Sequence, residues 1–176
     1  MHSVSNEAVY ERVSFPLYGL PSSWEGARWV GGWGGDSFYS LAHGGPDSPV
    51  LRVGSFSVSG WRIEDIEIGI ATQVDLLLDR PDPSPEDWLR VMMDLVSALP
   101  WEEVTLPVDG ELVPFRILRN GSAWEARSMS DEIRVVLDGR FGGGFPIDEV
   151  TLVRITDAQP YLEGHQRRFG RAGGEA

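Results

Sequence analysis

The dipeptide Asn120-Gly121 constrains the fold of this chain more than any other local feature. Asn-Gly is the strongest short signal for a β-hairpin, because both central positions of a type I′ turn need a positive φ. Apolar and polar residues alternate in 113–118, just before this dipeptide, and an apolar pattern resumes just after it. We therefore predict two antiparallel strands joined by a tight turn.

A two-residue turn at Asn120-Gly121 also predicts the register of this hairpin. Ile117 would lie opposite Trp124 on one face, and Arg116 would lie opposite Glu125 on the other. Apolar residues then meet on the face that packs into the core, and opposite charges meet on the other face.

The clearest helix signal follows a proline-rich segment. Pro85 suits the first helical position, acidic residues follow it at the positive end of the helix dipole, and a second proline ends the apolar pattern. These features predict a helix over 85–99. We expect it to lie on a sheet through Trp88, Met92 and Leu95, which share one side of a helix.

Short apolar runs and period-two alternation predict further strands in the rest of the chain. They are expected at 38–42, 51–58, 63–70, 74–78, 133–137 and 150–155. The turn-prone segment 43–47 joins the first two as a hairpin with a longer loop, and the glycine-rich segment 31–36 is predicted to be a loop.

Together these elements predict an α+β fold, a single domain with a largely antiparallel β-sheet packed by one main α-helix at about 85–99. The domain is expected to span residues 1–164. The polar residues 165–176 are expected to form a flexible tail.

Two absences restrict the chemistry of the protein. All fifteen basic residues are arginine, and there is no cysteine. Schiff-base chemistry, a lysine-containing phosphate loop, thiol chemistry and thiolate-bound metals are therefore excluded. Lysine depletion beside abundant arginine, glycine and alanine is typical of a GC-rich bacterial genome. We expect no cofactor and no metal site.

The hydrophobic runs are also informative about location. They are shorter and more interrupted than the roughly 20 apolar residues that span a bilayer. The N-terminus lacks a basic start followed by an apolar stretch, so no signal peptide is expected. We therefore expect a cytoplasmic protein that does not bind membranes.

The net charge of −12 is unevenly distributed. Residues 62–109 carry twelve acidic residues against three arginines. An acidic surface repels nucleic-acid phosphates, so no nucleic acid is expected to bind, and a basic protein is the complementary partner. Glu86, Asp87 and Asp94 are the candidate docking residues, and Glu67 is expected on the same solvent side. The alternative is that this charge serves solubility alone.

A second group of candidate binding residues lies in the tryptophan-rich N-terminal third. Its members are Arg28, Trp29, Trp33 and His43. His43 is the histidine farthest from the termini, and Asp36 and Asp47 are the nearest acids in sequence. No Gly-x-Ser-x-Gly element or His-x-x-x-His spacing accompanies them, so no catalytic residues are predicted. The tryptophans belong either to the core or to an interface.

Two functions therefore remain open. The first is a non-enzymatic binding protein, such as an inhibitor or immunity-type partner of a basic protein. The alternative is a small enzyme or ligand-binding domain with a pocket between sheet and helix, near His43 and the tryptophan-rich third. The sequence does not identify the ligand, the partner or the oligomeric state.

Overall fold

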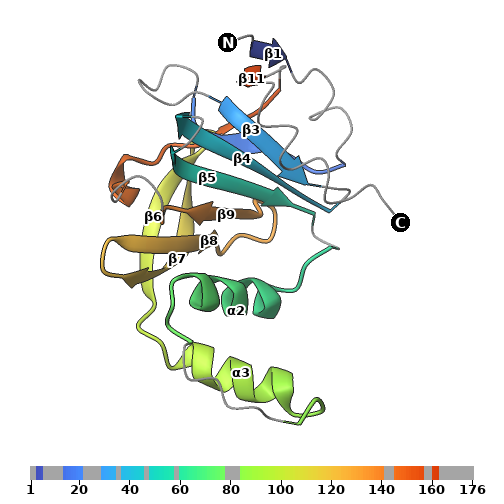
Figure 1. Cartoon of the computed structure of the whole chain (residues 1–176), viewed down its shortest axis with the longest axis vertical. Coiled ribbons are helices and arrows are strands. Elements are labelled where there is room, and N and C mark those ends of the chain that lie inside the picture. The colour runs from blue at the N-terminus through green and yellow to red at the C-terminus, as the bar shows by residue number, and fades with distance from the viewer. Residues whose placement is uncertain are drawn as a thin grey trace.

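Antiparallel pairing joins seven strands into the main sheet of this computed structural model, in the order β3-β4-β5-β9-β8-β7-β6 (Figure 1). The strands are β3 (Trp29–Gly34), β4 (Phe38–Gly45), β5 (Ser48–Phe56), β6 (Glu102–Val108), β7 (Glu111–Asn120), β8 (Ala123–Ser128) and β9 (Val135–Asp138). The structure describes residues 3–5, 14–21, 29–34, 37–45, 48–57, 60–77, 84–140, 145–156 and 160–162. The fold is a single α+β domain with a largely antiparallel sheet, as predicted. The expected tail at 165–176 lies outside the described residues.

The hairpin of β7 and β8 forms at the predicted place, but its register differs by two residues. Asn120 pairs with Ala123, so the loop is Gly121-Ser122, with Gly121 at a φ of 61°. Because side chains alternate with a period of two, this displacement leaves every side chain on its predicted face. Trp124 is buried, as expected, although it lies opposite Arg119.

The predicted pair of Arg116 and Glu125 is wrong for the same reason. Arg116 lies opposite Arg127, and Glu125 lies opposite Leu118. Two like charges directly across a strand pair are unfavourable unless an opposite charge lies between them. The α2 helix supplies that charge, as described below.

One face of the sheet carries the largest apolar core. Val135 and Leu137 of β9 are fully buried there and Ile133 packs against them, which confirms the predicted inward side of this strand. Segments from both ends of the chain close the core. They include the 3-10 helix η1 (Ile147–Glu149) and the strand β2 (Tyr18–Gly19), which pairs with β10 (Val153–Arg154). A separate pair joins β1 (Ser3–Ser5) with β11 (Pro160–Leu162).

The expected last strand at 150–155 is therefore mostly wrong. Only Val153 and Arg154 are in a strand, and β11 follows it. Val150 and Leu152 are apolar because their side chains are buried in the core, not because they belong to a regular ladder.

The glycine-rich segment predicted as a loop is a strand. Gly31, Gly32 and Gly34 pair with residues of β4 across a bulge near Trp29. The neighbouring hairpin forms as predicted, but both strands reach further into the turn than expected. β4 extends to Gly45, and β5 begins at Ser48. Backbone pairing to a central strand here outweighs the low strand propensity of glycine.

The helix α2 (Ile63–Gln73) replaces the strand predicted at 63–70. Ile63, Ile66 and Ile70 follow helical spacing, while Ile68 is also buried. Apolar residues occupy two sides of α2 because the helix lies between the sheet and a second helix. In the sequence, two apolar sides produce a period-two pattern like that of a strand, which explains the wrong prediction. The strand predicted at 74–78 is also wrong, since Val74 caps this helix through its N–H on the carbonyl of Ile70.

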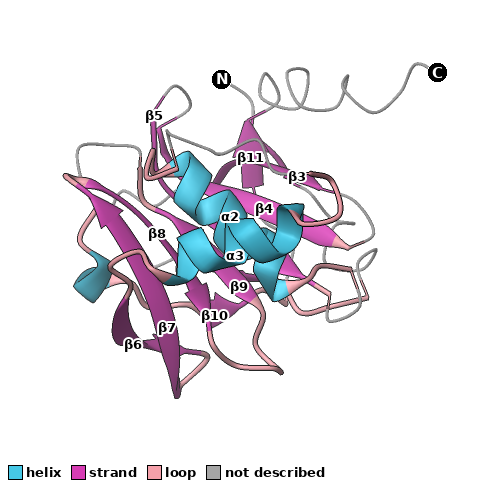
Figure 2. Ribbon diagram, turned by 90° about the horizontal axis from the view of Figure 1, so that it is seen from below, coloured by secondary structure: helices cyan, strands magenta, loops and turns pink. Residues whose placement is uncertain are grey.

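The predicted helix at 85–99 exists as α3 (Trp88–Ser97), but it packs on α2 and not directly on the sheet (Figures 1 and 2). Met92 is fully buried as expected, and so is Val96. Trp88 and Leu95 are instead 38% and 37% exposed. They lie at the border of the buried stripe, because α3 contacts a narrow helix and not a broad sheet. No helix among the described residues is long and apolar enough to cross a membrane.

The carboxylate of Glu67 joins α2 to the sheet. It is 3% exposed, so its expected place on the solvent side is wrong. Its Oε1 accepts hydrogen bonds from Arg116 Nη1 at 2.9 Å and from Arg127 Nε at 2.7 Å. Trp101, whose indole N–H binds the α3 carbonyl of Val96, lies 4.6 Å from the Arg116 guanidinium. One buried anion thus neutralises two arginines that face each other across β7 and β8.

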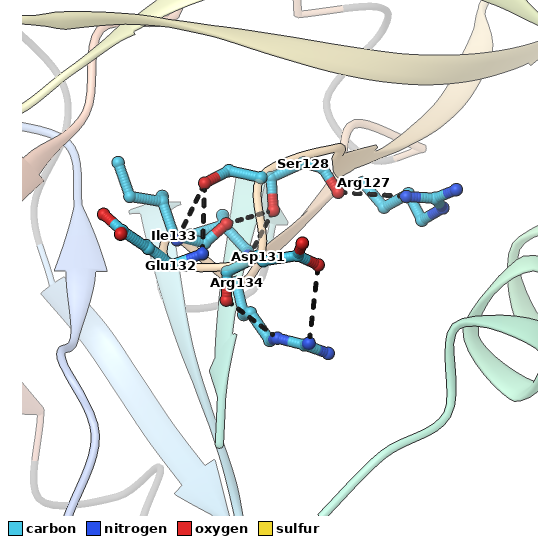
Figure 3. Close-up of polar contacts among 8 residues, drawn as sticks. Arg127, Ser128, Asp131, Glu132, Ile133 and Arg134 are labelled. Carbon is cyan, nitrogen blue, oxygen red and sulfur yellow. Dashed lines mark hydrogen bonds and ion pairs between the residues drawn. The ribbon is translucent and has the colours of Figure 1, made fainter. Parts of the chain in front are cut away.

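The connection between β8 and β9 determines the position of Arg127 (Figure 3). The hydroxyl of Ser128 donates to the carbonyl of Ile133 at 2.5 Å and accepts from the N–H of Val135 at 2.9 Å. Arg127 Nη1 donates to the carbonyl of Ser128 at 3.1 Å. Arg134 Nε binds the carbonyl of Asp131, which closes the same turn. Arg127 therefore reaches Glu67 from the end of β8, next to a turn held by several hydrogen bonds.

We predict that Glu67→Ala lowers the free energy of unfolding by about 3–5 kcal/mol, because it leaves two partly buried arginines facing each other without a counter-charge. Urea denaturation measures this loss. Asp94→Ala is the control, since its exposed contact with Arg90 at 3.9 Å should contribute less than about 1 kcal/mol. Equal losses in the two variants would contradict the prediction.

Candidate ligand-binding cleft

A cleft of about 270 Å³ lies between α2 and the face of the sheet opposite the main core. Side chains from β4, β5, β8 and β9 form its floor, and α2 forms its roof. The alternative function placed a pocket between sheet and helix near His43, whereas this cleft lies under α2 on the opposite face of the sheet. The volume is slightly below the range typical of drug-sized ligand sites, so it suits a small molecule.

Two glycines line this space in different ways. Gly54 of β5 lies opposite Ser40 and Val136, and the Phe38 ring packs so closely on it that a Cβ would approach the ring to 2.7 Å. Gly69 lies on α2, and a Cβ there would have only the Gln73 side chain within 4 Å. Space is therefore open at Gly69, whereas at Gly54 the Phe38 ring occupies it.

Aromatic side chains line one end of the cleft. Phe38 and Trp61 lie with ring centroids 5.7 Å apart, and Phe56 is buried beside them. Trp61 is 44% exposed, so it forms part of the rim. Ile66 and Ile70 of α2 add apolar surface above. This end favours a flat apolar group.

Charged side chains form the other end of the cleft. Glu125 of β8 and Arg52 of β5 both lie directly opposite Asp138 of β9, and all three line the cavity. Arg140 binds Asp138 with two hydrogen bonds, from Nε to Oδ1 at 3.0 Å and from Nη2 to Oδ2 at 2.9 Å. Its Nη1 also donates to the carbonyl of Gln73, at the C-terminal end of α2. Asp138 and Arg140 therefore hold each other in place.

The carboxyl of Glu125 is the unusual group of this cluster. It is 1% exposed, and its Oε1 lies 2.8 Å from Arg140 Nε. The single N–H of that nitrogen is directed at Asp138, so Oε1 accepts no hydrogen bond within the described part of the chain. Burial, and to a smaller degree the Asp138 charge, raises the pKa of Glu125 from 4.5 to about 9 against the opposite effect of Arg140 and Arg52. Burial therefore favours the protonated form of this carboxyl, whereas the nearby guanidinium groups favour the charged form.

This arrangement has defined chemical abilities. A protonated carboxyl offers one O–H donor and one carbonyl acceptor side by side. It can bind a polar ligand group or donate a proton. Among the described residues, no set of three acidic or histidine side chains is placed to hold a metal ion.

His43 does not belong to the cleft. It lies within β4 and not in a turn, and it faces the same side of the sheet as Leu51, in the direction of the main core. It is fully buried, and its Nε2 accepts the N–H of Leu20 at 3.3 Å. Burial lowers the pKa of His43 to about 3, so it is neutral at pH 7. The structure gives it a role in the core.

The other candidates from the N-terminal third fall largely outside the described residues. Arg28, Asp36 and Asp47 lie there entirely. Trp29 and Trp33 are described as backbone positions of β3, and Trp29 pairs with His43. A binding role for Arg28, Trp29 and Trp33 therefore stays a prediction.

The acidic candidates lie on α3 and the turn before it, away from the cleft. Glu86, Asp87 and Asp94 are all exposed. Asp87 and Asp94 contact Arg90 at 2.9 Å and 3.9 Å, so part of their charge is neutralised within the helix. All three side chains are accessible to solvent.

Sequence reasoning missed Glu125, Asp138, Arg140 and Arg52 as site residues. Glu125 was paired with Arg116, and this pairing concealed an acid without a partner. Asp138 and Arg140 stand at the start of the glycine-rich segment 138–145, which contains no motif typical of a binding site. Their only sequence signal is that they are charged and alternate with apolar residues such as Leu137, which places them on the face of the sheet away from the main core. This signal can be recognised only once the pairing of β8 with β9 is known.

We predict that Glu125→Gln stabilises the protein relative to the wild type, and that the gain grows with pH. Since the folded-state pKa is raised, the unfolded chain releases this proton above about pH 4.5 while the folded chain keeps it until about pH 9. Wild-type stability therefore falls through this window, by up to about 1.4 kcal/mol per pH unit. Urea denaturation of both proteins between about pH 5 and pH 8 measures the difference. A difference that does not change with pH would contradict it.

Comparisons with models of protein families, with curated protein sequences and with solved structures each find no match for this chain. Its function is therefore inferred from the chemistry of its own residues. Among the described residues, the cleft joins a cavity, an apolar wall and a buried acid in one place.

Proposed function

We propose that this protein is a non-enzymatic binding protein that takes a small, mainly apolar ligand in the cleft between α2 and the sheet. The observation that supports this best is the fully buried Glu125 carboxyl, whose Oε1 accepts no hydrogen bond from the described residues at the charged end of an apolar cavity. A buried polar atom without a partner is unfavourable by about 1–3 kcal/mol. A ligand donor that binds this oxygen recovers that free energy.

Binding is favoured over catalysis by the residues that the cleft contains. Its described lining includes carboxyls and arginines but no histidine, and His43 faces the other side of the sheet. A general acid accelerates a reaction when a nucleophile or base is placed beside the same substrate. We also propose a cytoplasmic location in a bacterium, and no nucleic-acid binding, on the grounds of cysteine and lysine usage and the net charge of −12.

We predict that Gly69→Leu abolishes binding in the cleft without unfolding the protein. The new side chain enters the cavity, while leucine favours the helix over glycine by about 0.5–1 kcal/mol. Ligand-observed NMR with a set of small aromatic compounds measures binding to the wild type and the variant.

Ala98→Leu is the matched control, because Ala98 is exposed beyond the end of α3. Compounds that bind the wild type should bind this control and fail to bind Gly69→Leu. A compound set that binds all three proteins equally, or none of them, would count against a ligand-binding cleft.

A second candidate function is the docking of a basic protein on α3. Trp88 and Leu95, seven residues apart, are exposed on one side of the helix, and Asp87 and Asp94 flank them. An aromatic anchor beside acidic side chains is complementary to an amphipathic basic helix. We propose such a helix as the partner, with arginine or lysine residues beside a leucine stripe.

We predict that a synthetic amphipathic helix with arginines beside a leucine stripe associates with the wild type more slowly as salt rises, because exposed charges act mainly on the association rate. Reversing Glu86, Asp87 and Asp94 to arginine should slow association further, and Trp88→Ala should speed dissociation. Surface plasmon resonance measures both rates.

The control for this experiment reverses three exposed acids elsewhere on the molecule, Glu111, Asp148 and Glu149. Equal slowing by the control would show that net charge alone attracts the peptide. An association rate that is insensitive to salt and to all reversals would leave the acidic residues with a role in solubility only.

A further inference from the structure

We propose that the outer edge of β6 binds an extended, basic segment of another protein, which adds a strand to the main sheet. This surface is separate from the cleft and from α3. The inference follows from the unpaired backbone groups of β6, from an extended segment of the chain itself that occupies one end of this edge, and from the side chains around the open part.

The backbone of β6 directs a row of hydrogen-bonding groups away from the sheet. β6 is the last strand of the seven and pairs on one side only, with β7. Asp109 and Gly110, both at positive φ, join the closing pair of Val108 and Glu111, so Val108 and alternate residues before it bond to β7. The N–H and C=O groups of 103 and 105 therefore point outward, and no described residue binds them.

The chain itself occupies one end of this edge. Leu152 forms a parallel bridge there: its N–H donates to the carbonyl of Pro107 at 2.9 Å, and its carbonyl accepts the N–H of Asp109 at 2.8 Å. These bonds confirm the outward direction of the odd-numbered residues, and they show that an extended segment fits against β6. The bridge is isolated, so Glu103 and Thr105 remain open, and both are exposed.

The side chains around the open part are acidic. Glu102 and Glu103 are both exposed and project from opposite faces of the strand. Glu102 contacts Arg119 at 3.4 Å. Arg116 lies opposite Glu103, but its guanidinium binds Glu67. A basic side chain of an added strand would lie directly beside Glu103 and neutralise its charge.

Exposed apolar side chains continue the sheet surface next to Thr105. Thr105 lies opposite Pro114, which is also exposed. Leu112, opposite Pro107, is 75% exposed. Met129, whose N–H binds the carbonyl of Pro114, is exposed as well. The aliphatic stem of an arginine on an added strand can lie across Thr105 toward these residues while its guanidinium stays in water.

A basic segment is favoured over a second copy of this chain. A second copy would bring its own Glu102 and Glu103 to the new strand pair, and both copies carry a net charge of −12. A segment with alternating arginines instead places positive charge beside Glu103. Its backbone supplies partners for the outward groups of Glu103 and Thr105, which is how extended peptides bind at the edges of other sheets.

The probe is a capped hexapeptide of alternating arginine and valine, and the control peptide has glutamate in place of arginine. Fluorescence anisotropy measures the affinity of each labelled peptide, and ¹⁵N-HSQC spectra locate the binding surface. We expect the arginine peptide to shift the amide signals of Glu103 and Thr105 and to slow their hydrogen exchange, because these N–H groups gain a partner. The glutamate peptide should bind at least about tenfold more weakly.

Thr105→Pro tests the main-chain pairing. It removes an outward N–H that β7 does not use, and proline is tolerated on an edge strand, so the variant should fold. Thr105→Val is the matched control, since it keeps the N–H. We expect the affinity for the arginine peptide to fall at least about tenfold in Thr105→Pro and to stay within about threefold in Thr105→Val. Glu103→Arg should lower it too, without removing a backbone group.

Equal binding to the wild type and to folded Thr105→Pro would overturn the inference, because the peptide would then bind by charge alone or at α3. If Thr105→Pro does not fold, unchanged amide signals of Glu103 and Thr105 in the wild type, or an unchanged affinity in Glu103→Arg, would overturn it. Failure of the arginine peptide to bind, or a wild-type dimer in sedimentation that Thr105→Pro abolishes, would do so as well. Ligand binding in the cleft is tested separately by Gly69→Leu.

Discussion

The contact of Glu67 with Arg116 and Arg127 is the interaction on which the arrangement of the other elements depends. β7 and β8 place the two arginines opposite each other, so the sheet needs an anion above them. The helix α2 supplies it through Glu67, and Gly69 of the same helix lines the cleft together with Gly54 of β5. The helix α3 then packs on α2, because Trp101 ties its last turn to the Arg116 guanidinium.

The predictions that held were those that depend on local patterns. The β7–β8 hairpin, the inward face of β9 and the existence of α3 follow from residues close in sequence. Most of the errors involve distant partners, and the register of the β7–β8 hairpin is the exception. The sequence predicts a strand at 63–70, where α2 forms, because this helix buries apolar residues on two sides. It predicts a loop at 31–36 because of the glycines there, but pairing with β4 makes this segment the strand β3. Sequence periodicity reports how many sides of an element are buried, but it does not identify what buries them.

The residues of the candidate cleft were not predicted from the sequence. The alternative function placed a pocket between sheet and helix near His43, which the alternation of β4 turns to the main core. The group that matters, Glu125, was assigned to Arg116 by a register in error by two residues. In the observed register Arg116 binds Glu67, and Glu125 lies opposite Asp138. A two-residue displacement at the turn therefore separates the predicted ion pair of Arg116 and Glu125 and leaves Glu125 as a buried acid. Charge pairing is an unreliable guide to register when several arginines and acids share one face.

The persistence of a buried acid at this place is itself informative. Glu125 contributes no hydrogen bond through Oε1 to the described structure, and its burial opposes folding between the pKa of the unfolded chain and its own raised value. The contrast with Glu67 is instructive, because that acid is equally buried but satisfies two arginines. Natural proteins retain destabilising groups where function requires them. An acid kept neutral at the end of an apolar cavity is therefore better explained by what it binds than by what it stabilises.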